Sequence, residues 1–129
     1  MAASTFVLTY DDYLTLDDLE NLIRPSSYRG APVELLTLSA CQTAAGDDKA
    51  ALGLAGVAIK AGARAALASL WFVSDQASAL MVDEFYRALA KPGTSKAQAL
   101  KHAQTVLRND PRFRHPRYWA PYIMIGNWL

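Results

Sequence analysis

The chain has 129 residues, of which 52% are hydrophobic and 19% charged, a composition typical of one globular domain with a buried core. Its 13 basic and 12 acidic side chains nearly cancel, so no overall field recruits nucleic acid or an anionic membrane. The lone cysteine excludes an internal disulfide, and the amino terminus lacks the pattern of a secretory signal; both predict a cytoplasmic protein. Charged residues, Gly or Pro interrupt every apolar run, so no membrane span is expected.

The first part of the chain is predicted to form a short strand and then a helix. The strand is "TFVLTY" (residues 5–10), which a turn follows. In "TLDDLENLI" (15–23) the apolar side chains share one helical face, and Thr15 is the candidate N-cap. The helix is expected to end before Pro25, because proline lacks the N–H that an interior helical position needs, and a loop follows over 24–32.

A strand–helix–strand unit is predicted next. Residues Val33–Ala40 ("VELLTLSA") are nearly all apolar, as expected for a central parallel strand that is covered on both faces. Apolar residues then recur at helical spacing up to Gly62, a helix-terminating position. The run "RAALASLW" (64–71) completes the unit, and its length is that of a parallel βαβ crossover.

Two helices and a last strand complete the predicted order. One helix extends from about Ser74 to the "PG" pair, and the next begins at Ser95 with capping-box spacing and ends near Asn109. Because two helices separate it from the preceding strand, the strand in 118–128 is expected to run antiparallel, and Pro121 suits an edge position. These elements predict an α/β fold with a mainly parallel sheet, one antiparallel edge strand and helices on both faces.

Three stretches in this order resemble the CHAT family, caspase-like domains often found in bacterial proteins with tetratricopeptide repeats. They are "LTLSACQTAAG" (36–46), "AGARAALASLWFVSD" (61–75) and "HPRYWAPYIMIGNW" (115–128), and the similarity extends over 6–129. The resemblance implies a caspase-like three-layer fold, present here in part, and a cysteine-peptidase site in which Cys41 attacks a peptide carbonyl. It also implies a peptide or protein substrate, and a larger parent protein with tetratricopeptide-repeat or other regions.

One departure from the family concerns the base. The family's catalytic histidine precedes the cysteine in a His-Gly motif, and no histidine precedes Cys41 here. His102 and His115 both follow it, so neither inherits the role by motif. The strands before the histidine are absent as well, and residues 1–129 are therefore expected to be a single, truncated CHAT domain.

Cys41 has two interpretations. It comes at the carboxyl end of a predicted parallel strand, where open α/β sheets bind ligands, and a helix N-terminus after it would lower the thiol pKa. The acids in "QTAAGDD" oppose that effect, so without an imidazole Cys41 is expected to be a weak nucleophile. The alternative is an inert buried cysteine, since free Cys is among the most buried residue types. The three motifs together favour the nucleophile.

Two residues after the second strand are candidates for substrate binding. In the caspase-like fold a peptide pairs with the backbone beyond this strand, so Trp71 is the candidate wall of the cleft; the alternative is a packed core aromatic. Asp75 is the candidate partner for a basic substrate side chain. Its alternative role is to cap the following helix or to place a negative charge in its first turn. No metal or cofactor is expected.

The remaining polar candidates are interpreted as structural. An antiparallel last strand would return His115 to the carboxyl edge, yet about two strand spacings (~10 Å) from Cys41, too far for a base, so we assign it to a structural loop. His102 is expected to be solvated. The arginines at 112, 114 and 117 with interleaved aromatics resemble a nucleic-acid patch, but the near-zero net charge favours a solvated loop and no nucleic-acid partner.

Two function classes remain open. The first is a cysteine-type endopeptidase portion that forms a thioester at Cys41, probed by a peptide-based electrophile. The second is a non-catalytic signalling or assembly module that keeps the fold and the peptide-binding cleft. In either case the strand at Val33–Ala40 would lack one neighbour, so we expect a homo-oligomer formed through this sheet edge or by exchange of residues 5–10.

Overall fold

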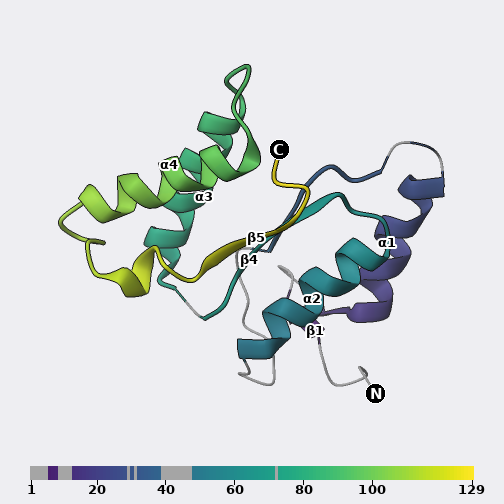
Figure 1. The fold of residues 1–129 in the computed structure, drawn as a ribbon. Helices are drawn as coiled ribbons and strands as arrows, with labels where there is room; N and C mark the ends of the chain where they lie inside the picture. The colour runs from purple at the N-terminus through teal and green to yellow at the C-terminus, as the bar shows by residue number, and fades with distance from the viewer. Residues whose placement is uncertain (1–5, 9–12, 29, 31, 39–47, 72) are drawn as a thin grey trace.

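The computed structural model describes residues 6–8, 13–28, 30, 32–38, 48–71 and 73–129, and the chain is an α/β protein (Figure 1). Its elements in chain order are β1 (Phe6–Leu8), β2 (Tyr13–Thr15), α1 (Leu16–Tyr28), β3 (Leu36–Leu38), α2 (Asp48–Lys60), β4 (Ala65–Ser69), α3 (Asp75–Leu89), α4 (Lys96–Asn109), the short 3₁₀ helix η2 (Pro116–Tyr118) and β5 (Tyr122–Gly126).

The main sheet has three described strands in the order β3-β4-β5. β3 runs parallel to β4, with Leu36 opposite Ala66, and α2 connects the two strands, so the predicted strand–helix–strand unit is confirmed. β5 runs antiparallel to β4 at the other edge, as the two intervening helices predict. The described sheet is therefore mixed rather than mainly parallel. β1 and β2 form a separate antiparallel pair. The sequence pattern did not predict β2, because three residues are too few to show a period.

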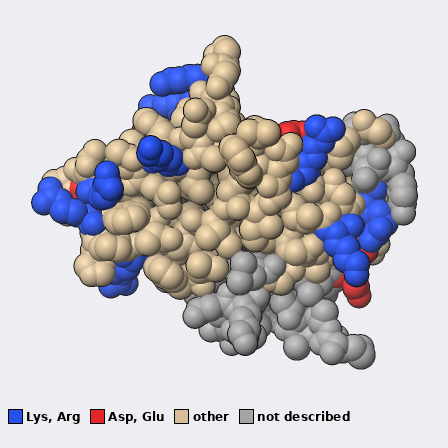
Figure 2. All heavy atoms as spheres, in the orientation of Figure 1, with Lys and Arg blue, Asp and Glu red and all other residues tan. Residues whose placement is uncertain are grey.

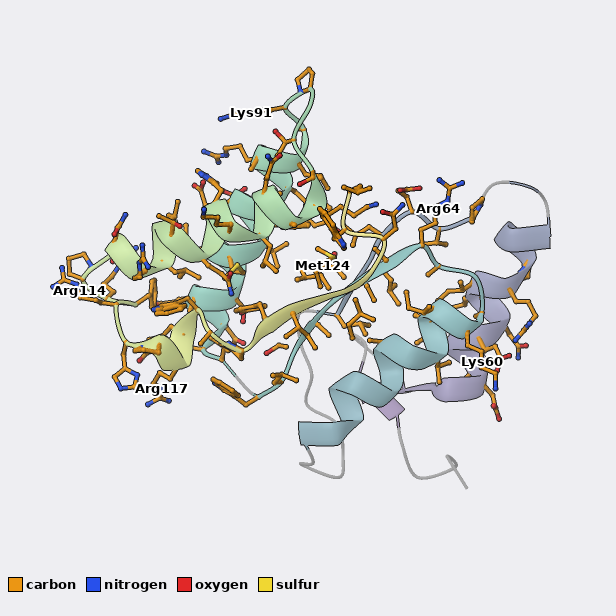
Figure 3. All side chains as sticks on the ribbon, viewed as in Figure 1. Lys60, Arg64, Lys91, Arg114, Arg117 and Met124 are labelled. Carbon is orange, nitrogen blue, oxygen red and sulfur yellow. The ribbon has the colours of Figure 1, made fainter. Side chains whose placement is uncertain are left out.

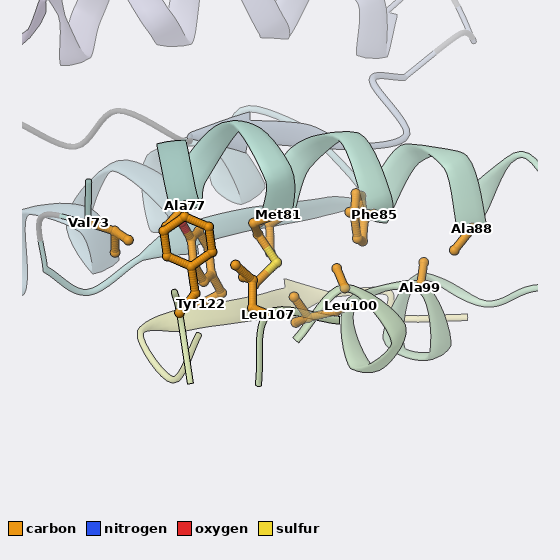
Figure 4. Packing of buried hydrophobic residues seen from close by; sticks show 12 residues of the cluster. Val73, Ala77, Met81, Phe85, Ala88, Ala99, Leu100, Leu107 and Tyr122 are labelled. Atoms are coloured by element: carbon orange, nitrogen blue, oxygen red, sulfur yellow. The ribbon is translucent and has the colours of Figure 1, made fainter. Parts of the chain in front are cut away.

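Helices α3 and α4 cover one face of the sheet (Figure 1). Met81 and Phe85 of α3 are fully buried in one cluster with Leu67 of β4 and Leu107 of α4. Figure 4 shows Leu107 beside Met81. Both helices begin at a serine: the Ser74 hydroxyl accepts the N–H of the third helical residue of α3, and Ser95 forms the predicted capping box with Gln98. Local sequence signals and core burial thus fix this helix pair together.

Helices α1 and α2 cover the opposite face (Figure 1). Ala66 and Ala68 alternate with Leu67 along β4 and pack against Ala55 of α2, and all three alanines have no exposed surface. Such small side chains let the helix lie close to the sheet. Gly62, with φ of 112°, ends the α2 segment as predicted, because few other residues adopt a positive φ. β4 is thus buried on both faces.

The prediction that α1 ends before Pro25 is wrong, because the helix continues to Tyr28. Pro25 has no N–H to donate to the carbonyl four residues earlier, so the helix proceeds with one hydrogen bond fewer. Leu19 and Ile23 of α1 are buried in a cluster with Ala58 of α2. We attribute the persistence of the helix to this packing, since tertiary contacts contribute most of the stability of short helices.

A buried lysine connects α4 to the ends of two strands. Lys96 is 4% exposed, and its ammonium donates to Glu34 Oε1 (2.8 Å), to the Asn127 carbonyl (3.1 Å) and to the main-chain oxygen of Leu129 (3.2 Å). The hydrogen bond from Lys96 lowers the pKa of the Glu34 carboxyl, and the charges of Lys96 and Arg64 act in the same direction. The segment before β3, through Glu34, and the segment after β5 are thereby held on α4.

Candidate functional site

The carboxyl ends of β3 and β4 lie at the same edge of the sheet, because the two strands are parallel and Leu38 is opposite Ala68. In the sequence, Cys41 comes three residues after Leu38, and Trp71 comes three residues after Ala68. Cys41 itself lies outside the described residues, so its role as nucleophile stays a prediction. The described strands do bring the carboxyl ends of β3 and β4 to one edge, where the sequence predicts that Cys41 and Trp71 lie.

Trp71 is a surface residue at this edge. The residue is 41% exposed, so the alternative interpretation as a packed core aromatic is wrong. The indole Nε1 donates to the Arg117 carbonyl at 3.0 Å, and the Ser69 hydroxyl donates to the Trp71 carbonyl at 2.6 Å. Hydrogen bonds therefore hold an exposed aromatic side chain where the second strand ends. Its contact with a substrate stays a prediction.

Asp75 is the first residue of α3 and is exposed. The N-cap is Ser74, whose hydroxyl accepts the Ala77 N–H at 3.3 Å, so Asp75 does not cap the helix. The carboxylate lies in the first turn, where the helix dipole favours a negative charge. Of the two structural alternatives, the geometry therefore allows only the charge in the first turn. Binding of a basic substrate side chain stays a prediction.

His115 belongs to the turn that contacts Trp71. It is exposed and caps η2, with its Nδ1 accepting the Arg117 N–H at 3.2 Å. A neutral imidazole that accepts at Nδ1 carries its proton at Nε2, so Nε2 has no lone pair for a thiol proton. The antiparallel β5 does return this segment to the carboxyl edge, with Tyr122 opposite Ser69. The structural-loop interpretation of His115 is confirmed.

His102 lies on the outer surface of the helix pair. Its Nε2 is 3.1 Å from Glu84 Oε2, and 46% of its side chain is exposed, in agreement with the predicted solvated position. Glu84 lies nine residues into α3, about 14 Å along the axis from the sheet-edge end of the helix. Both histidines of the chain thus have a hydrogen-bond partner among the described residues.

Arginines gather where α4 leads into η2 (Figures 2 and 3). The Arg112 guanidinium lies 4.9 Å from the Phe113 ring centroid, and that of Arg117 lies 5.2 Å from the Tyr118 centroid. Arg112 also forms an ion pair with Asp110 at 2.8 Å. The hydrogen bonds that Arg112 donates from its side chain and backbone lower the pKa of the Asp110 carboxyl. The turn is thus ordered by its own contacts, as a structural loop requires.

Sequence reasoning missed the contact that joins this turn to the sheet edge. Trp71 and Arg117 are separated by 46 residues, and their hydrogen bond has no local signature. The antiparallel return of the last strand is the signal that brings the two segments to one edge. No described helix is long and apolar enough to span a membrane. Within the described ranges, no three His, Cys, Asp or Glu side chains are grouped so as to hold a metal ion.

Comparison with known proteins decides the family, because the CHAT domain family matches residues 2–127. This chain belongs to the CHAT family. The CHAT chain is 33% identical over 98 residues to tetratricopeptide repeat protein 28 of Homo sapiens, and 34% identical over 97 residues to the protein of the same name from Mus musculus. Each alignment covers 74% of the CHAT chain and 4% of the relative, so the chain spans a small part of those proteins. No solved structure matches it.

Proposed function

We propose that this chain is the cysteine-bearing portion of a caspase-like CHAT endopeptidase, with Cys41 as its nucleophile. The observation that carries the proposal is the parallel register of β3 and β4, which brings the ends of both strands to one edge. There Trp71 is exposed and held by its hydrogen bond to Arg117. A peptide would lie beyond β4 against Trp71, within reach of the segment that follows β3.

The chemistry follows from the nucleophile. The Cys41 thiolate would attack the scissile carbonyl carbon, and collapse of the tetrahedral intermediate would break the C–N bond. The amine would leave with a proton and a thioester would remain. Water would then hydrolyse the thioester to a carboxylic acid and restore the thiol. Because both histidines have structural partners, we place the base outside this chain, and the chain alone is expected to be inactive.

Asp75 provides a hypothesis for specificity. It is exposed in the first turn of α3, directly beyond the strand end that carries Trp71. A lysine or arginine side chain of the substrate would find a negative charge there, next to an aromatic wall. An Asp75→Asn variant is expected to lose preference for peptides with a basic residue while it retains affinity for neutral ones.

The experiment is labelling with a peptide-based electrophile, followed by intact-mass measurement. We expect one equivalent to attach to the wild-type chain, faster than a small alkylating agent of equal intrinsic reactivity, and none to attach to Cys41→Ala. The same reagent is applied to a longer protein in which a His-Gly strand precedes this chain. No labelling in either protein would overturn the peptidase assignment.

The second candidate is a non-catalytic assembly module that binds peptide without cleaving it. The engagement of both histidines favours this candidate for the chain as it stands. It predicts that Trp71→Ala weakens peptide binding whereas Cys41→Ala leaves binding unchanged. A longer protein that binds peptide through this edge but leaves it uncleaved after long incubation would decide for the module.

The parent protein and assembly are part of the proposal. Since the curated relatives are named tetratricopeptide repeat proteins, we place this domain in a larger parent that contains such repeats. We place the parent in the cytoplasm, because a lone cysteine forms no internal disulfide and this fits a reducing compartment. β3 is an edge strand of the described sheet, which supports self-association through that edge. A monodisperse monomer in light scattering at high concentration would contradict self-association.

A further inference from the structure

The charge of this chain is unevenly distributed. Within residues 108–117 four arginines accompany one aspartate, so this segment carries a formal +3 while the remainder of the chain carries −2. We call these four side chains the basic end: Arg108, Arg112, Arg114 and Arg117. Figure 3 shows Arg114 and Arg117 at one end of the molecule, and Figure 2 shows Lys and Arg atoms gathered there. The overall charge of +1 therefore hides a local cationic surface.

The basic end is structurally ordered. Two tryptophans donate their indole N–H to its backbone: Trp119 to the Arg114 carbonyl at 3.1 Å and Trp71 to the Arg117 carbonyl at 3.0 Å. The Arg112 and Arg117 guanidinium groups lie over the rings of Phe113 and Tyr118, and these two rings meet edge to face with 5.4 Å between their centroids. Because the backbone of Arg114 and Arg117 is already anchored, binding of a ligand to these two side chains costs less conformational entropy.

Most of this charge is not neutralised by the part of the chain that the structure describes. Arg112 is paired with Asp110. Arg108, Arg114 and Arg117 are exposed, and none of them forms an ion pair with another described residue. A guanidinium offers a planar fork of N–H donors that fits a carboxylate with two parallel hydrogen bonds.

We infer that the basic end is a docking surface for an acidic peptide segment of a substrate or partner protein. Its position favours a peptide, because Arg117 is hydrogen-bonded to Trp71 at the edge where the main sheet ends. Its size disfavours nucleic acid, because three unpaired arginines are few beside the roughly 6–10 phosphate contacts of typical DNA-binding proteins. Docking at this position rests on the peptide-binding edge proposed above, but it requires no chemistry at Cys41, so loss of docking and loss of peptidase activity are separate outcomes.

The test uses fluorescence anisotropy with the 129-residue chain. One labelled peptide carries Glu at every second position, and a matched peptide carries Gln there. The variant is the double substitution Arg114→Gln, Arg117→Gln. Its control is Lys60→Gln, Lys91→Gln, which removes the same charge from exposed positions away from the basic end (Figure 3). Circular dichroism checks that the variants fold, and the comparison of the two peptides on the wild type needs no variant.

We expect the Glu peptide to bind at least about tenfold more tightly than the Gln peptide, with affinity that falls as salt rises. The arginine pair should lose about tenfold in affinity, the lysine control less than about twofold, and Cys41→Ala should bind as the wild type does. Equal affinity for the two peptides, equal losses in the two double variants, or tighter binding of a single-stranded oligonucleotide of the same charge would overturn the inference.

Discussion

Gly126 ends β5 at a position where only glycine fits. Its φ is +94°, and a Cβ built there lies 2.4 Å from the Arg64 carbonyl oxygen and 2.9 Å from Ile59 Cδ1. The Arg64 carbonyl cannot retreat freely, because it accepts the Asn127 N–H at 2.8 Å. A Gly126→Ala substitution must therefore separate the end of β5 from the start of β4 as well as adopt a strained φ.

The cost has two parts. A positive φ in a residue with a Cβ costs about 1–2 kcal/mol. Displacement of the Arg64 carbonyl, with the loss of its hydrogen bond to Asn127 and of contacts at Ile59, costs about another 1–2 kcal/mol. We expect Gly126→Ala to lower the free energy of unfolding by about 2–4 kcal/mol. That is a large share of the ~5–15 kcal/mol that typically stabilises a domain.

Urea denaturation, followed by circular dichroism and tryptophan fluorescence, measures this change. Two glycines are matched controls, because a Cβ at either has no atom within 4 Å. Gly30→Ala carries only the strain of φ +72° and should cost about 1–2 kcal/mol, whereas Gly53→Ala, inside α2, should stabilise the chain by about 0.5–1 kcal/mol. A Gly126→Ala protein no less stable than Gly30→Ala would refute the close approach of the end of β5 to the start of β4.

Three further predictions concern charge and capping. Lys96→Met keeps the apolar stem but removes the donor to Glu34 and to two main-chain oxygens. It should lower the free energy of unfolding, measured by urea denaturation, by about 2 kcal/mol, against less than about 0.5 kcal/mol for the exposed control Lys101→Met. Equal losses in the two variants would contradict the role of Lys96. Ser95→Ala removes the capping box of α4 and should cost about 1 kcal/mol, detectable as a lower urea midpoint; an unchanged midpoint would count against the cap. Folding lowers the pKa of Glu34, so the stability that this carboxylate contributes is complete above its ordinary pKa of 4.5 and is lost as pH falls through the lower folded-state pKa. Glu34→Gln should therefore flatten this part of the curve of stability against pH. An unaltered curve would contradict the interaction.

The sequence predicts well where the signal is local. The apolar run before Cys41, the helical spacing up to Gly62 and the capping box at Ser95 each predicted an element that the structure contains. The antiparallel direction of the last strand followed from the two helices before it. In each case a residue pattern within one element, or the number of crossings between elements, determines the outcome.

Prediction fails where contacts between distant parts of the chain determine the local structure. Pro25 would end an isolated helix, but α1 persists against α2. Lys96 appears in the sequence as a first-turn helical residue, and its partner Glu34 lies 62 residues earlier. The Trp71 indole is likewise anchored by the carbonyl of Arg117 in η2, 46 residues later, and no sequence pattern reveals such a distant contact. Cys41 was identified from motifs that match a family, and its geometry lies outside the described residues.

The central claim is that the edge marked by Trp71 presents a peptide to Cys41. The most direct measurement is the ratio of two alkylation rates at Cys41, one for a peptide-based electrophile and one for iodoacetamide, in the wild type and in Trp71→Ala. We expect the ratio to fall about tenfold in the variant, because the peptide loses its wall while the thiol keeps its reactivity. A ratio that Trp71→Ala leaves unchanged would contradict the account.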